Sequence, residues 1–173
     1  MRRHMGLLGA SLLAGLIAIV VNTAILEAAD WIPLVTARGG LLKLLKAYCS
    51  DPLVRLGLAD LWTNFHLPGP DTGVFKSGFH IVVGLLMAAF YAVVLEPILP
   101  GVPLAKGLIY ALLVWLANAF IVLPWIGEGI AGSRYLSFAG MLYFAMAHNV
   151  FFVGLAILYP YFLKSPRRYP APA

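Results

Sequence analysis

Residues 75–97 read FKSGFHIVVGLLMAAFYAVVLEP, an almost continuous apolar stretch that contains one imidazole, that of His80. A helix rises about 1.5 Å per residue, and the hydrocarbon core of a bilayer is about 30 Å thick. The stretch is therefore long enough to cross a membrane as a helix. Its histidine would lie inside the membrane, near one edge.

Small side chains follow His80 at helical spacing, at Gly84, Ala88 and Ala92. Such a stripe lets a neighbouring backbone come close, so this face is predicted to pack against protein. The opposite face, which carries Val82, Leu86 and Val93, is then predicted to face lipid.

The composition extends this interpretation to the whole chain. Of the 173 residues, 62% are hydrophobic and 11% are charged, whereas soluble proteins carry about 25% charged residues. We therefore expect one all-α membrane domain over residues 1–173, a bundle of four transmembrane helices. Their expected ranges are about 6–29, 75–97, 104–123 and 137–163.

The first of these segments resembles a secretory signal in its position. Its apolar run, Gly6 to Leu26, is longer than the roughly 7–15 residues of a signal peptide, and no clear cleavage site follows it. We interpret it as a retained transmembrane helix.

The long connection between the first two helices contains GGLLKLLKAYCS at residues 39–50. One helical face carries Leu41, Leu44, Leu45 and Tyr48, while the other carries Lys43, Lys46 and Ser50. This pattern predicts an amphipathic helix over about 40–50 that lies in the membrane interface.

The positive charges argue for membrane topology rather than for nucleic-acid binding. The 12 Lys and Arg residues are scattered beside apolar segments and form no continuous basic face. Arg2 and Arg3 adjoin the first helix, so the positive-inside rule favours both termini in the cytoplasm.

Each predicted helix brings at least one polar side chain into the membrane. Counted from the outer ends of the helices, three of these lie at roughly 5–11 Å depth and His148 lies at roughly 16 Å. The last helix places His148 on a stripe with Met141, Ala145 and Phe152. The predicted intramembrane polar cluster is Asn22, His80, Asn118, His148 and Asn149.

Three interpretations of this cluster remain. Amides and imidazoles can join helices through hydrogen bonds and fix how they pack. Alternatively, His80 and His148 could be the two axial ligands of a b-type haem. A quinone or small lipid could also bind among these residues and the nearby rings of Phe144, Phe152 and Trp115.

No catalytic or metal site is predicted. The sequence shows no nucleophile and base at recognisable spacing, and the single cysteine, Cys49, can make no internal disulfide. Cysteine and histidine spacings typical of zinc sites are also missing.

The order of several short motifs resembles the YagU-like family of uncharacterised bacterial inner-membrane proteins. The likeness covers about residues 6–161, is carried by residues 80–148, and does not extend to the long loop. Its motifs are His80, Phe90-Tyr91, Glu96-Pro97, Gly107, Pro124-x-x-Gly127 and Ala147-His148. The resemblance implies a bacterial inner membrane and no established enzymatic activity. It identifies no substrate. It singles out His80 and His148 but assigns them no role.

These observations predict a non-catalytic accessory or anchoring subunit of a larger membrane complex. Its expected partners are membrane lipids and other membrane-protein subunits, not nucleic acid. The alternative from another functional class is a redox anchor that binds haem b or quinone through His80 and His148.

Overall fold

The computed structural model describes residues 6–32, 34–37 and 39–163, which form helices and no strands. In chain order the helices are α1 (Leu7–Ala28), α2 (Gly40–Arg55), α3 (Leu58–Asn64), α4 (Gly73–Phe90), η1 (Tyr91–Leu95), α5 (Glu96–Ile98), α6 (Pro103–Ala117), η2 (Asn118–Val122), α7 (Leu123–Trp125), η3 (Ile130–Gly132) and α8 (Phe138–Leu163).

Four continuous helical spans are long and apolar enough to cross a membrane: Leu7–Ala28, Gly73–Ile98, Pro103–Trp125 and Phe138–Leu163. Many of their large apolar side chains point outward and are exposed. Such a surface suits lipid and would be unfavourable in water. The predicted all-α polytopic fold is confirmed, and the chain is a multi-pass membrane protein.

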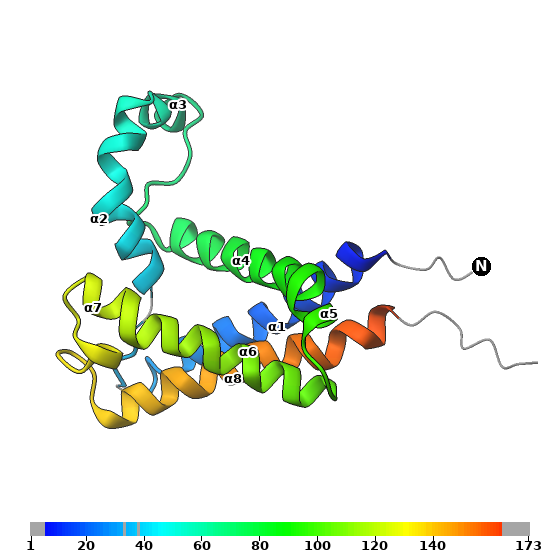
Figure 1. Cartoon of the computed structure of the whole chain (residues 1–173). Coiled ribbons are helices and arrows are strands. Elements are labelled where there is room, and N and C mark those ends of the chain that lie inside the picture. The colour runs from blue at the N-terminus through cyan, green and yellow to red at the C-terminus, as the bar shows by residue number, and fades with distance from the viewer. Residues whose placement is uncertain (1–5, 33, 38, 164–173) are drawn as a thin grey trace, which may run out of the picture.

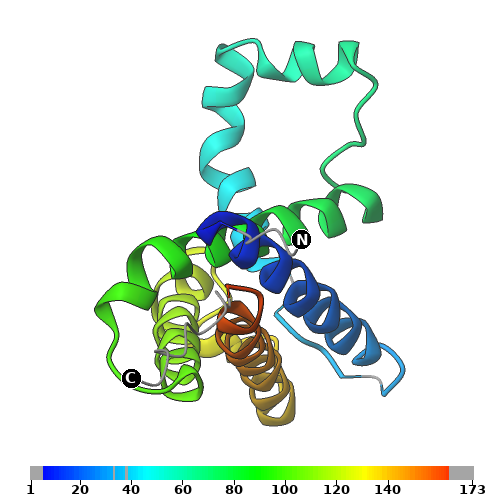
Figure 2. The same cartoon turned by 90° about the vertical axis from the view of Figure 1, so that its right-hand side faces the viewer.

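The four spans lie side by side in the bundle shown in Figures 1 and 2. Helix α8 packs against both α1 and α6, and α4 packs against α1. The described chain begins and ends at the same end of the bundle, as an even number of crossings requires (Figure 1).

Small residues bring α1 and α4 together as the sequence predicted. Gly84, Ala88 and Ala92 are buried, whereas Val82 and Leu86 are 54% and 65% exposed. A Cβ atom added at Gly84 would lie 2.6 Å from the Ile19 side chain of α1. The two helices are therefore in contact along this stripe.

The predicted stripe of α8 is wrong in register. Of its four residues only Phe152 is fully buried, and Met141, Ala145 and His148 are half-buried. Helix α8 contacts two neighbours, α1 and α6, so it buries a broader surface than one stripe. The buried residues are Gly140, Phe144, Ala147, Phe151, Phe152, Leu155, Ala156 and Tyr159.

Two spans contain a five-residue π-helical segment that an uninterrupted helix would lack. These segments are η1 (Tyr91–Leu95) and η2 (Asn118–Val122), and each ends two residues before a proline, Pro97 or Pro124. Proline has no N–H, and its ring crowds the carbonyl one turn earlier, so a wider turn accommodates it. The prolines therefore mark these departures from α-helical register.

Helices α2 and α3 form an arm that leaves the bundle at the end opposite the start of α1 and the end of α8 (Figures 1 and 2). The predicted interfacial helix over 40–50 lies within α2, which runs across the direction of the bundle. At its base the chain is close to α7, because a Cβ atom added at Gly40 would lie 3.3 Å from the Leu123 side chain.

Candidate functional site

Asn22 joins three of the four spans inside the membrane. Its amide Nδ2 donates a 2.7 Å hydrogen bond to the backbone oxygen of Ala147 on α8, and its Oδ1 lies 2.9 Å from His80 Nε2 on α4. The carbonyl of Ala147 can only accept, which fixes the amide orientation and makes His80 Nε2 the donor to Oδ1. Both the donor and the acceptor of the Asn22 amide are thus bonded to other helices.

This junction exists because α1 and α4 approach closely at their small residues. Gly15 packs against Ala88, since an added Cβ there would lie 2.4 Å from the Ala88 Cβ. With no larger side chain between the backbones, the imidazole of His80 reaches across to Asn22. Sequence reasoning correctly brought these two residues to one level of the bundle.

His148 lies one residue beyond the carbonyl that binds Asn22, so it occupies the same region. Its Nδ1 donates a 2.9 Å hydrogen bond to the backbone oxygen of Phe144, one turn earlier on α8. The ring also makes an edge contact with the Phe144 ring at a centroid distance of 4.4 Å. With Nδ1 as donor, Nε2 carries the lone pair of the neutral ring.

The two other predicted members of the cluster do not join it. Asn118 donates to the backbone oxygen of Val114, and Asn149 donates to that of Ala145. Each bond stays within one helix, four residues apart. The cluster therefore consists of Asn22, His80 and the adjoining stretch of α8.

This geometry bears on the haem and quinone hypotheses. Bis-histidine ligation through Nε2 requires an unprotonated nitrogen on both rings. His148 Nε2 meets that requirement, whereas His80 Nε2 donates to Asn22. Haem ligation would require His80 to release Asn22, so the arrangement favours helix joining. Cofactor binding stays a prediction.

A second polar cluster, which was not predicted from the sequence, lies at the end of the bundle where α1 begins and α8 ends. Glu96 Oε1 lies 2.9 Å from Lys106 Nζ, and Glu96 Oε2 accepts a 2.6 Å hydrogen bond from the Tyr91 hydroxyl. Lys106 also donates to the backbone oxygen of Glu96 at 2.9 Å. A sequence signal for this cluster does exist. Glu96 and Lys106 are opposite charges that lie ten residues apart, on either side of a short proline turn.

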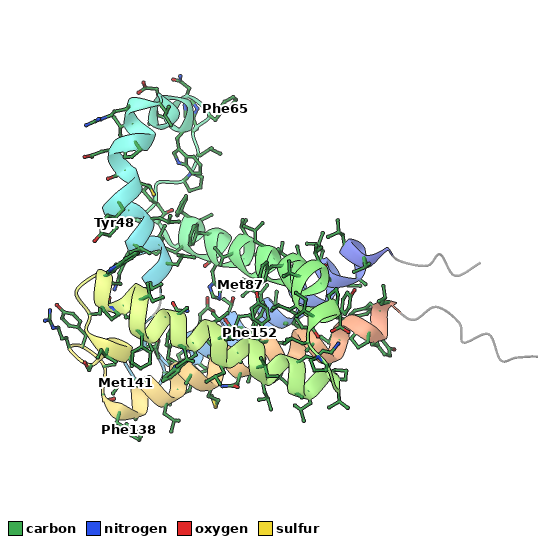
Figure 3. The ribbon with its side chains drawn as sticks, in the orientation of Figure 1. Tyr48, Phe65, Met87, Phe138, Met141 and Phe152 are labelled. Carbon is green, nitrogen blue, oxygen red and sulfur yellow. The ribbon has the colours of Figure 1, made fainter. Side chains whose placement is uncertain are left out.

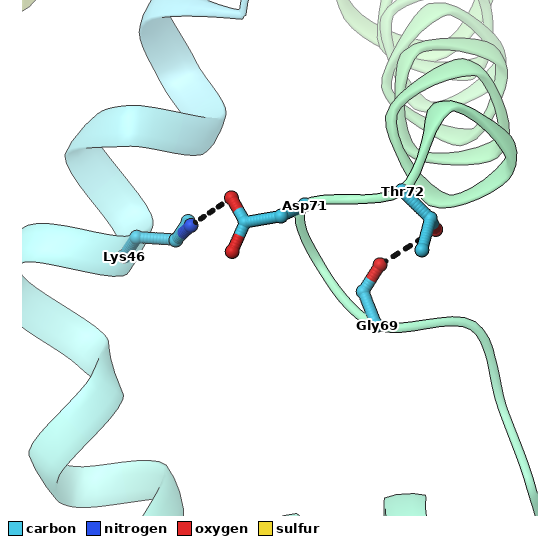
Figure 4. Close-up of polar contacts among 4 residues, drawn as sticks. All are labelled: Lys46, Gly69, Asp71 and Thr72. Atoms are coloured by element: carbon cyan, nitrogen blue, oxygen red, sulfur yellow. Dashed lines mark hydrogen bonds and ion pairs between the residues drawn. The ribbon is translucent and has the colours of Figure 1, made fainter.

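Two ion pairs connect the arm to neighbouring segments. Lys43 Nζ lies 2.6 Å from Oε1 of Glu128, whose side chain is nearly buried between α7 and α8. Lys46 Nζ lies 2.6 Å from Oδ1 of Asp71 in the loop before α4 (Figure 4). The lysines that define the polar face of α2 thus hold its position.

Asp71 is exposed, and Lys46 is the main influence on its carboxyl group. The hydrogen bond and positive charge of Lys46 lower the pKa of the carboxyl group below 3.8. Next to it, Thr72 caps α4. Its hydroxyl donates to the Gly69 carbonyl at 2.7 Å (Figure 4) and accepts from the Phe75 N–H at 3.3 Å.

Within the described parts of the chain, no group of three His, Cys, Asp or Glu side chains is placed to hold a metal ion. Comparison with protein-family models, curated proteins and solved structures returned no match. The resemblance to the YagU-like family therefore stays a prediction.

Proposed function

We propose that this multi-pass protein is a non-catalytic accessory or anchoring subunit of a larger complex in a bacterial inner membrane. In this proposal the bundle holds the protein in the bilayer, and the arm formed by α2 and α3 is the attachment surface for another subunit.

The observation that carries this proposal is the arm. It extends away from the bundle and presents apolar side chains that the rest of the chain does not cover (Figure 3). Tyr48 is 62% exposed and Phe65 at the far end is 73% exposed. Val54 and Leu56 are similarly exposed. Surface of this kind commonly marks an interaction site.

The base of the arm supports the same function. Lys43 and Glu128 form an ion pair in which the carboxylate is largely buried, and the rings of Tyr48 and Trp125 lie 6.4 Å apart. These contacts fix the start of α2 on the bundle. A partner bound farther along the arm would thereby be held at a fixed place in the membrane.

The interior of the bundle favours a structural role. The polar side chains Asn22, His80 and His148 are engaged in hydrogen bonds that join or stiffen helices. Interhelical bonds of this kind contribute about 0.6–2 kcal/mol each and specify packing. We infer that they serve the fold of the anchor.

The proposed orientation places both termini in the cytoplasm, because Arg2 and Arg3 precede the first helix. The arm would then lie on the outer side of the membrane. Exposed aromatic residues lie at that end of the bundle, including Trp31, Trp125 and Phe138, and such residues favour the membrane interface.

The proposal is tested by measuring the mass of the particle extracted in mild detergent. One chain weighs 18.7 kDa, and we expect a larger particle that contains at least one other membrane subunit. Substituting Ser for Tyr48 and Phe65 should release that subunit. The control Tyr135→Ser changes an equally exposed aromatic residue outside the arm and should leave the particle intact.

Two outcomes would contradict the proposal. A particle that contains this chain alone in every mild extraction would remove the accessory role. A complex that survives both arm substitutions would leave the accessory role but remove the arm as its attachment surface.

A further inference from the structure

A cavity of about 450 Å³ opens beside the Glu96 cluster, at the end of the bundle where α1 begins and α8 ends. This volume falls within the roughly 300–1,000 Å³ of small-molecule sites. Four of its lining residues are apolar and two, Glu96 and Tyr159, are polar. The lining residues are Leu7, Ala92, Val93, Glu96, Pro97 and Tyr159.

Glu96 is held in place but is not saturated. Lys106 binds one carboxylate oxygen and the Tyr91 hydroxyl binds the other. A carboxylate has about four acceptor positions, so positions remain for a further donor. The side chain of Glu96 is 30% exposed, while that of Lys106 is 11% exposed. The acceptor is therefore the accessible member of the ion pair.

Tyr159 supplies the cavity with a hydroxyl donor. The residue is only 1% exposed, and none of the described residues is hydrogen-bonded to its hydroxyl. The hydroxyl oxygen is not one of the fully buried side-chain atoms, so it can be reached from the cavity. Because Tyr159 lines the cavity, a molecule bound there could satisfy this hydroxyl.

The π-helical segment η1 places these groups together. Tyr91 and Ala92 of η1 are buried, and Glu96 follows the segment directly. The extra residue in a π turn shifts the following side chains around the helix, and such turns are frequent at functional sites. Here Tyr91 and Glu96 meet through their side chains, five residues apart.

The cavity lies close to the boundary between headgroups and hydrocarbon. Glu96 is two residues before the end of the span at Ile98, and Tyr159 is four residues before the end of α8 at Leu163. At the helical rise these distances are roughly 3–6 Å. Membrane lipids are the molecules that present a polar head and apolar chains at this level.

We propose that this cavity binds the headgroup of a zwitterionic lipid with a primary ammonium, a phosphatidylethanolamine. The ammonium donates to the free acceptor positions of Glu96, and a phosphate oxygen accepts from the Tyr159 hydroxyl. The apolar lining contacts the beginning of the acyl chains. A choline head lacks N–H donors and leaves Glu96 without a new bond.

The test compares lipid binding by native mass spectrometry of the full chain in detergent, at equal concentrations of phosphatidylethanolamine, phosphatidylcholine and phosphatidylglycerol. We expect retention of the ethanolamine lipid to exceed that of the choline lipid at least about tenfold, because a hydrogen bond to a charged group is lost with choline. Glu96→Gln should reduce this preference, because the ammonium binds Glu96. Tyr159→Phe should instead reduce the retention of both the ethanolamine and the choline lipid, because both carry the phosphate that accepts from its hydroxyl.

Matched controls exist for both variants. Glu27→Gln neutralises an exposed carboxylate at the other end of α1, and Tyr161→Phe alters an exposed tyrosine two residues after Tyr159. Both should keep the lipid preference. If Glu96→Gln does not fold, the Tyr159→Phe variant and the lipid comparison in the unmodified protein decide the question.

Equal retention of the ethanolamine and choline lipids by the unmodified protein would overturn the proposal. So would an unchanged preference in folded Glu96→Gln, or an unchanged retention of both lipids in Tyr159→Phe. Soluble phosphoethanolamine should fail to displace the lipid, and displacement by it would overturn the assignment to a membrane lipid. None of these outcomes depends on the arm or on a partner subunit.

Discussion

His80 Nε2 and Asn22 Oδ1 lie 2.9 Å apart across the contact between α1 and α4, and the same amide binds α8 through the Ala147 carbonyl. One side chain therefore determines how three helices meet. A group with two partners on two other helices is more sensitive to substitution than a group bonded within its own helix.

Asn22→Ala should destabilise the bundle by roughly 1–3 kcal/mol, because it removes two interhelical hydrogen bonds and leaves His80 without its partner. Asn149→Ala removes only a bond within α8 and should cost less. Thermal unfolding in one detergent would compare them. Equal losses of stability would show that the amide of Asn22 does not join the helices.

Gly107→Ala should destabilise by roughly 1–3 kcal/mol through overpacking. The new Cβ would lie 2.7 Å from the Val153 Cα on α8, and backbone atoms cannot move aside as a side chain can. Gly78→Ala is the control, since an added Cβ there meets nothing within 4 Å. It should be neutral or stabilise by up to about 1 kcal/mol. If both variants unfold alike, the close approach of α6 and α8 is wrong.

The contact between Lys46 and Asp71 should depend on pH and salt. Lys46 lowers the pKa of Asp71, so the ion pair is complete above about pH 4 and is lost as the pH falls through the lowered value. Spin labels at Ala47 and Pro70 should show a broader distance distribution at low pH and in high salt. Asp71→Asn should be broad at every pH, whereas Asp60→Asn should behave like the unmodified protein. A narrow distribution in Asp71→Asn, equal to that of the unmodified protein, would contradict the pairing.

The histidines should contribute to packing and not bind haem. Protein purified from haem-replete cells is expected to show no Soret band, and His80→Ala should lower the thermal stability by about one interhelical hydrogen bond. An absorption spectrum and a melting curve measure both quantities. A Soret band that disappears in His80→Ala and in His148→Ala would establish the redox alternative instead.

Topology can be measured directly. Four crossings place both ends of the chain on one side, and the positive charges of Arg2 and Arg3 favour the cytoplasm. A reporter fused after Ala173 should therefore be cytoplasmic, and one inserted beside Pro70 should be external. The reverse result would also move the arm to the cytoplasmic face.

The sequence predicted those features that depend on periodicity along one helix. The small stripe of α4 identified its buried face, and the positions of Asn22 and His80 gave the level at which they meet. Periodicity does not show which helices become neighbours. For that reason the register of α8, which is buried between two partners, was predicted incorrectly.

The Glu96 cluster was missed for a different reason. A helical wheel assumes 3.6 residues per turn, and the π turn at Tyr91–Leu95 changes the direction of every side chain after it. Pro97 was a visible warning of this change. The direction of the arm had no comparable signal, because it depends on contacts between Lys43 and Glu128, which are 85 residues apart.

The arm also makes the protein asymmetric within the plane of the bilayer. A bare bundle of four helices presents a nearly round outline, and neighbours can approach it from any side. With α2 and α3 extending on one side only, the outline gains a projection on that side (Figure 2). Rotation about the membrane normal then changes which neighbours can come close, so crowding by itself could align many copies of this chain in the same direction.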